Sequence, residues 1–418
     1  MQSARHHMKS FTVQPPETDL EDAFQQPRNS HDNAADDALR RDSQTALMRF
    51  PNTSFGISLG LAGQAIMWKS IGLSTSVSTY TGTEGPKAAS SCFWVASCVV
   101  LVVFSGLYGA KVARHPKLVR FEWEHAHRAH FFNAPHLAVL MLAIGAPPTI
   151  SDVRGLRIVM YLSGVMQTIL TQIIYARWLF GESQNIGHAR PPFLLSMVGW
   201  LLLAILAQQA RLPSLAAFFF GGGFILYLLV LISIFLSMHT SIREKGSPAL
   251  FLLLAPPSLS STALAGFTDS GTFTKEACML LGWCCVLLLL LFHLGPQLLA
   301  KPLSLGAYWA YVFPLSAFAT AGTLYADSEG TLAARGFACF LILLSALSLV
   351  VVVLRMSWHH VGVVQGKYRW DDPIVGAWQK QQEAEAEEAE VGLAQRPTAT
   401  VAQRQGQEPQ PPLQQQQV

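Results

Sequence analysis

Long apolar runs recur along the chain and are separated by short polar stretches. Each run has roughly 17–25 residues, which is the length of helix that crosses the hydrocarbon core of a bilayer. Because lipid offers no hydrogen bonds to a backbone, the pattern predicts an all-α, polytopic membrane protein. We count ten runs, near residues 54–72, 91–112, 131–147, 156–180, 192–209, 214–238, 248–266, 276–295, 303–325 and 332–355.

Polar segments flank this apolar core at both ends. Residues 1–49 are rich in Asp, Gln, Arg and Ser, and residues 358–418 carry a Glu/Ala run followed by Pro and Gln. Such segments bury too little apolar surface to offset the entropy of the chain. We therefore expect two mostly disordered tails around a membrane domain of residues 50–357, although the run from Glu383 to Glu390 also suits a short solvated helix.

Lys and Arg residues indicate how the helices cross the membrane. With the amino terminus inside, the inner connections hold ten of these residues and the outer connections hold seven, Lys69 among them. Basic residues next to the first and last runs add to the inner side. The positive-inside rule therefore predicts cytosolic termini, and we expect the plasma membrane to house the protein.

The composition agrees with a membrane protein and excludes other classes. Hydrophobic residues make up 51% of the chain and charged residues only 13%, whereas soluble domains contain about 25% charged residues. No basic stripe with interleaved aromatic residues predicts nucleic-acid binding. The sequence also lacks HExxH and P-loop patterns, so we expect neither an enzyme nor a bound cofactor.

Prolines distinguish two kinds of apolar run. The odd-numbered runs contain or closely follow prolines, and the even-numbered runs contain none. A proline inside a helix frees a carbonyl, which is tolerated at membrane depth only where the backbone faces protein or water. The alternation favours an inner ring of odd helices around a pathway, held by an outer ring of even helices. The alternative is that these prolines are only packing kinks. They are Pro51, Pro135, Pro191, Pro192, Pro256, Pro257 and Pro314.

The centres of the runs carry few polar side chains. They hold no Asp, Glu, Lys or Arg, and their main polar groups are Gln64, Gln167 and Gln172. A transporter coupled to protons or cations usually places carboxylates there. An uncharged path with the dipoles of broken helices suits an anion instead.

Three histidines stand close together before the third run. The spacing of His125, His127 and His130 does not place all three on one face of a helix. We favour a solvated loop here over a zinc site or a pH sensor, and we predict no metal site.

Several short motifs, taken together, carry a family resemblance. The core, about residues 50–355, resembles the tellurite-resistance/dicarboxylate transporter family, also called voltage-dependent or slow-type anion channel proteins. This family includes bacterial tellurite-resistance proteins, a yeast malate permease and plant guard-cell anion channels. The motifs are Phe50-Pro51, Phe55-Gly56-Ile57-Ser58-Leu59-Gly60-Leu61, Phe131-Phe132-Asn133-Ala134-Pro135, Ser196-Met197-Val198-Gly199, Ala255-Pro256-Pro257-Ser258 and Trp309-Ala310-Tyr311-Val312-Phe313-Pro314.

The resemblance implies a fold and a gate. It implies ten transmembrane helices as five tandem hairpins, with the odd helices around a central pore and three subunits that each hold one pore. The family's pore is closed by a phenylalanine before a proline in the ninth helix, which falls here on Phe313. Trp200 is a candidate second pore aromatic. The candidate pore-lining residues are Gly56, Gly60, Pro135, Pro256 and Pro314.

The sequence thus predicts a channel or facilitator for small monovalent anions such as nitrate and chloride. One alternative is a transporter of malate-like dicarboxylates or of sulfite or tellurite. Another is a membrane receptor or enzyme subunit that uses the histidine segment. Ser43, in Arg40-Arg41-Asp42-Ser43, is a candidate site for a regulatory kinase.

Overall fold

The structure, a computed structural model, describes residues 47–180, 189–240, 248–268, 273–293, 307–364 and 373–394. This described part is built from helices and their connections and contains no strand. The chain divides into two units, one of residues 32–372 and the other of residues 1–31 together with 373–418.

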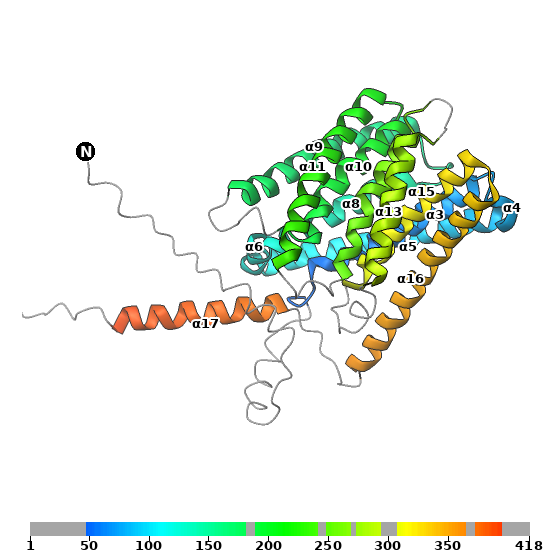
Figure 1. Cartoon of the computed structure of the whole chain (residues 1–418). Helices are drawn as coiled ribbons and strands as arrows, with labels where there is room; N and C mark the ends of the chain where they lie inside the picture. The colour runs from blue at the N-terminus through cyan, green and yellow to red at the C-terminus, as the bar shows by residue number, and fades with distance from the viewer. Residues whose placement is uncertain are drawn as a thin grey trace, which may run out of the picture. The chain divides into compact units, whose positions relative to one another are not determined.

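The larger unit consists of helices that alternate along the chain between two kinds, here called inner and outer (Figure 1). The inner helices are α3 (Gly56–Leu73), α8 (Ala134–Gly145), α10 (Leu194–Gln209), α12 (Ala255–Ala265) and α15 (Val312–Glu329). The outer helices are α5 (Glu84–Arg114), α9 (Val153–Phe180), α11 (Pro213–Thr240), α13 (Lys275–His293) and α16 (Leu332–Val364). Short helices α4 (Ser78–Thr81), α6 (Pro116–Glu124) and α7 (Ala126–Ala129) lie in the connections.

The inner helices form a closed ring. In order, α3 contacts α8, α8 contacts α10, α10 contacts α12, α12 contacts α15, and α15 contacts α3 again. Each outer helix contacts the inner helix that precedes it in the chain. This arrangement of two rings agrees with the prediction from the alternating prolines.

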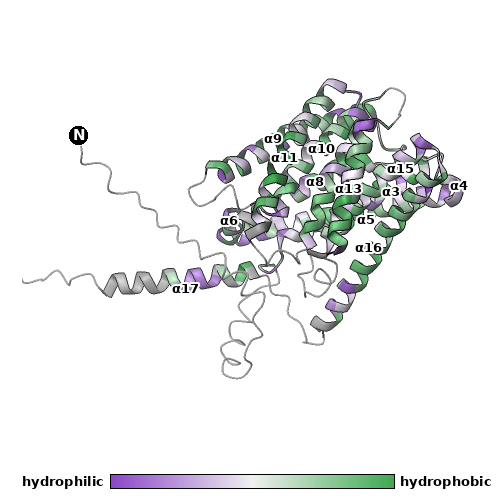
Figure 2. Ribbon diagram, viewed as in Figure 1, coloured by the Kyte–Doolittle hydropathy of each residue, from purple (hydrophilic) through white to green (hydrophobic). Residues whose placement is uncertain are grey.

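Burial separates the two kinds of helix. Within the protein, 89% of the apolar window in Pro191–Gln209 and 83% of that in Pro248–Ala265 are buried, against 11% in Glu84–Arg114 and 22% in Leu332–Val361. Figure 2 shows hydrophobic residues along α13 and α16, whose exposed faces suit lipid. Seven described helices are long and apolar enough to cross a membrane. The count of ten spans therefore stays a prediction.

A short 3-10 helix precedes every inner helix. These segments are Asn52–Phe55, His130–Asn133, Pro191–Phe193, Pro248–Leu254 and Ala307–Ala310. The prolines lie at this changeover, since Pro135 and Pro256 are the second residues of α8 and α12, and Pro314 is the third residue of α15. N–H groups in the first turn of an α-helix have no partner within the helix. Pro256 and Pro314 lie inside apolar runs of the sequence, but each stands in the first turn of its α-helix and does not interrupt it.

Side-chain amides join neighbouring helices. Gln64 Nε2 on α3 donates to Ser316 Oγ (3.1 Å) on α15 and to Ser345 Oγ (3.0 Å) on α16. On α9, Gln167 Nε2 donates to the carbonyl oxygen of Ser196 on α10. Both glutamines are fully buried, whereas Gln172 is exposed. Gln64 and Gln167 therefore connect neighbouring helices. Such hydrogen bonds stabilise helix packing in a bilayer, where no water competes for them.

A buried ion pair fixes the entrance to α3. Lys111 Nζ on α5 lies 2.8 Å from Glu122 Oε1 on α6, and both side chains are 0% exposed. The same ammonium donates to the carbonyl oxygen of Phe50 at 2.8 Å, and Tyr108 Oη donates to Glu122 Oε2 at 2.6 Å. These bonds connect α5, α6 and the chain entering the first 3-10 helix.

The smaller unit contains one described helix, α17 (Pro373–Ala394). It includes the run from Glu383 to Glu390 and begins ten residues earlier. This helix agrees with the alternative of a short helix over the Glu/Ala run, and disorder of the rest of the tail stays a prediction. The rest of both predicted tails, apart from residues 47–49 and 358–364, lies outside the described residues.

Replacing Glu122 tests the buried ion pair. Glu122→Gln leaves the Lys111 ammonium buried without a counter-charge, which typically lowers the free energy of unfolding by about 3–5 kcal/mol. Glu124→Gln is the matched control, since the Arg120–Glu124 pair is exposed (80% and 46%) and such pairs contribute little. The measurement is thermal unfolding of the purified protein in detergent. Equal melting temperatures for the two variants would contradict a structural role for the buried pair.

Candidate functional site

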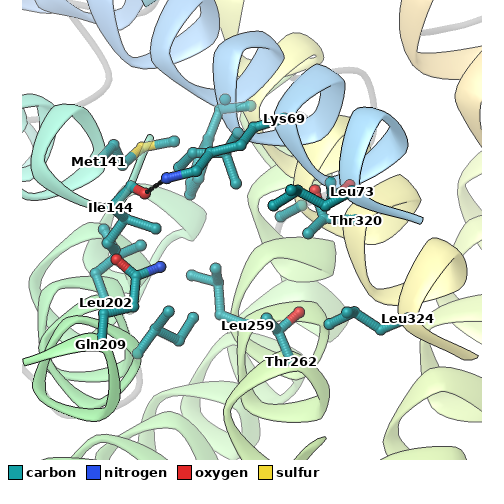
Figure 3. Close-up of a pocket in the computed structure, with 16 residues that line it drawn as sticks. Lys69, Leu73, Met141, Ile144, Leu202, Gln209, Leu259, Thr262, Thr320 and Leu324 are labelled. Atoms are coloured by element: carbon teal, nitrogen blue, oxygen red, sulfur yellow. Dashed lines mark hydrogen bonds between the residues drawn. The ribbon is translucent and has the colours of Figure 1, made fainter. Parts of the chain in front are cut away.

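The ring of inner helices encloses a cavity of about 180 Å³ (Figure 3). Every inner helix contributes to its wall. The lining residues are Gly63, Ile66, Lys69, Ser70 and Leu73 of α3, Met141 and Ile144 of α8, Leu202, Ile205 and Gln209 of α10, Leu259 and Thr262 of α12, and Phe313, Ala317, Thr320 and Leu324 of α15.

Helical periodicity explains which residues face the cavity. On α15 the lining residues follow one another at spacings of four, three and four residues, from Phe313 to Leu324. Such spacings keep side chains on one face of a helix. At a rise of 1.5 Å per residue, this stripe runs along the cavity for about 16 Å.

Exposure changes along the cavity. At one end, Phe313 is 2% exposed and packs in the main hydrophobic core. At the other end, Leu73 near the last turn of α3 is 66% exposed, and Gln209 at the end of α10 is exposed as well. The cavity therefore opens toward the carboxyl-terminal ends of the inner helices, and Phe313 lies at its buried end.

The wall is mostly apolar but carries one ammonium group. Lys69 Nζ donates to the carbonyl oxygens of Ile144 (2.9 Å) and Ala146 (2.8 Å) at the end of α8, and Figure 3 shows Lys69 reaching across from α3. Lys69 was predicted to lie in an outer connection, whereas it lies in the last two turns of α3. Its position inside the first apolar run, three residues before the end, was the signal available in the sequence.

The glycines of α3 divide between two surfaces. Gly63 lines the cavity, but Gly60 faces the 3-10 helix before α15. A Cβ atom on Gly60 would stand 2.5 Å from Trp309 Cε3 and 3.3 Å from Val312 Cβ. Gly60 thus permits a close approach between α3 and Trp309.

The other candidate pore-lining residues lie around the changeover from 3-10 to α-helix. Gly56 and Pro135 are half-buried, and Pro256 and Pro314 are buried. None of the four lines the described cavity, whose wall begins further along α3, α8 and α12 and, on α15, at Phe313.

Trp200 points away from the cavity. Its Nε1 donates to Thr171 Oγ1 (3.0 Å) on α9, and its ring fills the space beside Gly222 on α11. Residues two apart on a helix differ in direction by about 200°, and Leu202 is the residue that lines the cavity. The structure therefore separates Trp200 from Phe313.

The histidine segment is more ordered than predicted. It forms α7 and the start of a 3-10 helix, and His130 is 2% exposed with its ring centroid 3.9 Å from that of Phe193. His130 Nδ1 lies 3.1 Å from Ser196 Oγ. The expectation of a solvated loop is therefore corrected for His130. In the described part of the chain, no group of three or more His, Cys, Asp or Glu residues is placed to hold a metal ion, and Ser43 lies outside it.

The cavity, its ring of helices and the core around it fall within one family match. The model of the family described as "voltage-dependent anion channel" matches residues 49–357. The chain belongs to the voltage-dependent anion channel family. The predicted resemblance and the prediction of an integral membrane protein are thereby confirmed.

Relatives of this voltage-dependent anion channel family member include three proteins of Arabidopsis thaliana. S-type anion channel SLAH3 is 30% identical over 287 residues, which are 67% of this chain and 44% of SLAH3. Guard cell S-type anion channel SLAC1 is 28% identical over 326 residues, 75% of this chain and 56% of SLAC1. S-type anion channel SLAH1 is 25% identical over 329 residues, 77% of this chain and 83% of SLAH1. The chain thus spans about half the length of SLAH3 and SLAC1. The family and these relatives are described as anion channels, not as enzymes.

A substitution at Gly60 tests the close approach beside the cavity. Gly60→Ala forces Trp309 to move, and overpacking of this kind typically lowers the free energy of unfolding by about 1–3 kcal/mol. The control is Gly106→Ala on α5, where a Cβ atom meets nothing within 4 Å. That change leaves stability equal or slightly higher, because alanine favours a helix over glycine. The measurement is thermal unfolding of both variants in detergent. A Gly60→Ala protein as stable as Gly106→Ala would refute the close packing of Gly60 against Trp309.

Proposed function

We propose that this protein conducts small monovalent anions, such as nitrate and chloride, through a pore within each subunit that Phe313 closes. One observation carries the proposal: all five inner helices line a single cavity, and Phe313 lies at its buried end. Membership of the voltage-dependent anion channel family supports the class of solute.

Phe313 has the chemistry of a hydrophobic gate. An apolar ring in a narrow passage excludes water, and an ion cannot cross a dry constriction. Phe313 is the second residue of α15 and precedes Pro314, whose ring fixes the backbone angle φ. The backbone is therefore held while the ring of Phe313 borders empty volume on its cavity side, into which it can rotate.

Beyond Phe313 the proposed pathway continues toward the changeover from 3-10 to α-helix. Gly56, Pro135, Pro256 and Pro314 surround this region and remain our candidates for the second half of the pore. Gly60 is a neighbour of this path that packs on Trp309. Trp200 lies outside the pathway, because it packs on α9 and α11.

The cavity wall favours a monovalent anion over a dicarboxylate. Among the described lining residues, Lys69 is the one charged side chain. A dianion such as malate would leave its second carboxylate among leucine, isoleucine and methionine side chains, and an unpaired charge in apolar surroundings is costly. A malate-like transporter remains the alternative, with Lys69 as the group that would hold one carboxylate.

The setting of the channel is part of the proposal. The distribution of Lys and Arg residues supports cytosolic termini, so the cavity would open to the outside of the plasma membrane. We further propose a homotrimer with one pore per subunit, as the resemblance implies. A basophilic kinase that modifies Ser43 would act on the cytosolic side.

Replacing the proposed gate tests the function. Phe313→Ala removes the ring that closes the pore, so we expect at least a tenfold larger anion current than in the wild type. A dry constriction that raises the barrier to ion passage by about 1.4 kcal/mol already lowers the rate tenfold. The measurement is whole-cell current in oocytes bathed in nitrate, chloride or malate. The reversal potential should follow the nitrate and chloride gradients.

Phe318→Ala is the matched control. Phe318 lies on the same helix but packs against Phe337 of α16, with ring centroids 6.2 Å apart, and does not line the cavity. Its removal should leave the current near the wild-type level after correction for surface expression. Absence of current from Phe313→Ala protein that is present at the surface would refute the channel, and malate uptake would then be measured.

A further inference from the structure

We propose that Lys69 forms an anion-binding subsite in the open half of the cavity, and that its occupant is one weakly hydrated, monovalent anion. The inference rests on the proposed function and names a residue that selects the anion before it reaches Phe313. It is carried by the position of Lys69 in the cavity wall and by the two carbonyl groups that hold it there.

Two hydrogen bonds hold the ammonium in place. Lys69 Nζ donates to Ile144 O and Ala146 O, which belong to the last residue but one of α8 and to its carboxyl-terminal cap. The end of a helix carries partial negative charge, so a cation is stabilised there. An ammonium group has three donors. Two are used by α8, and the third is left for a ligand in the cavity.

The charge of Lys69 is not neutralised by these partners. Carbonyl groups are dipoles without net charge, and the ion pairs formed within the described residues do not include Lys69. An anion that enters the cavity therefore meets a fixed positive charge. Fixing the ammonium in advance also removes the entropy loss that a free lysine side chain would suffer on binding.

The subsite lies between the open end and the proposed gate. Gly63 on α3 stands against Ser316 on α15, since a Cβ atom there would lie 3.3 Å from Ser316 Cβ. Ser316 is three residues beyond Phe313, and Lys69 is six residues beyond Gly63. At 1.5 Å per residue, Lys69 is about 9 Å further toward the open end than Gly63. An anion held by Lys69 would wait in front of the gate.

The rest of the wall sets the class of anion. Leu202, Ile205 and Leu259 offer no hydrogen bonds to a bound ion. The hydroxyl groups of Thr262 and Thr320 line the same cavity but donate to carbonyl oxygens of their own helices. An anion must therefore shed much of its water there, which is least costly for large monovalent ions such as nitrate. One cation compensates one negative charge, so sulfate and dicarboxylates are disfavoured.

Charge removal in an open channel tests the subsite. In the Phe313→Ala background, Lys69→Met should raise the nitrate concentration that gives half-maximal current by about tenfold, because a unit charge a few ångströms away contributes at least that much. Lys69→Arg keeps the charge and should restore most of the affinity. Lys87→Met is the matched control, since Lys87 is 54% exposed and paired with Glu84 outside the cavity. Its curve should coincide with that of the background.

Identical curves for Lys69→Met and Lys87→Met would overturn the subsite, and Lys69 would then serve only as a cap for α8. The channel itself would still stand, because the Phe313→Ala background conducts. A silent background with confirmed surface expression would refute the proposed function instead.

A binding measurement decides the subsite without any current. Purified wild type and variants are melted while nitrate replaces sulfate at constant ionic strength. Nitrate should stabilise wild type and Lys69→Arg relative to Lys69→Met, because binding to the folded state raises its stability. A nitrate effect of equal size in all three proteins would overturn the proposal.

Discussion

Backbone hydrogen bonding in an apolar surrounding constrains this structure more than any other interaction. Lipid tails offer no acceptor for a backbone N–H group and no donor for a backbone carbonyl group. The backbone at a changeover from 3-10 to α-helix must therefore be covered by protein. Each inner helix begins at one such changeover, marked by prolines such as Pro135, Pro256 and Pro314. The outer helices are uninterrupted and bear the exposed apolar surface. The two-ring architecture therefore follows because only uninterrupted helices can face lipid. The cavity arises because the five inner helices close into a ring.

Polar side chains are divided between holding the rings and lining the cavity. Gln64, Gln167 and the Lys111–Glu122 pair are fully buried and bonded to neighbouring elements. The amide nitrogens of both glutamines and the two charges of the ion pair are thus bonded within the protein, and none of these four residues lines the cavity. Lys69 differs, because neutral carbonyls hold it while it borders open volume. The same chemistry that stabilises the end of α8 thus leaves a net charge facing the cavity.

The sequence predicted the helical elements of the fold but not the residues that line the cavity. Run lengths and alternating prolines predicted ten helical elements in two kinds, because both features are local. Glycine and proline motifs pointed to Gly60 and Pro256, which the structure places beside the cavity and not in its wall. Which face of a helix looks inward depends on its rotation about its axis, set by packing among five helices. Trp200 was assigned to the wrong face for that reason. Lys69 was missed because it was counted in an outer connection, although it lies inside the first apolar run.

Because Phe313 and Lys69 lie on different helices, different residues would close the pore and select the anion. Phe313 stands at the second position of α15, where Pro314 restrains the backbone, so only its side chain borders the open volume. Lys69 stands on another helix and further toward the open end, anchored to a third. Because the hydrogen bonds of the Lys69 ammonium go to α8 and not to α15, rotation of the ring leaves the ammonium where α8 holds it. Under the proposed mechanism the preferred anion would then be the same at every degree of opening, whereas a selecting group on α15 itself would move with the gate.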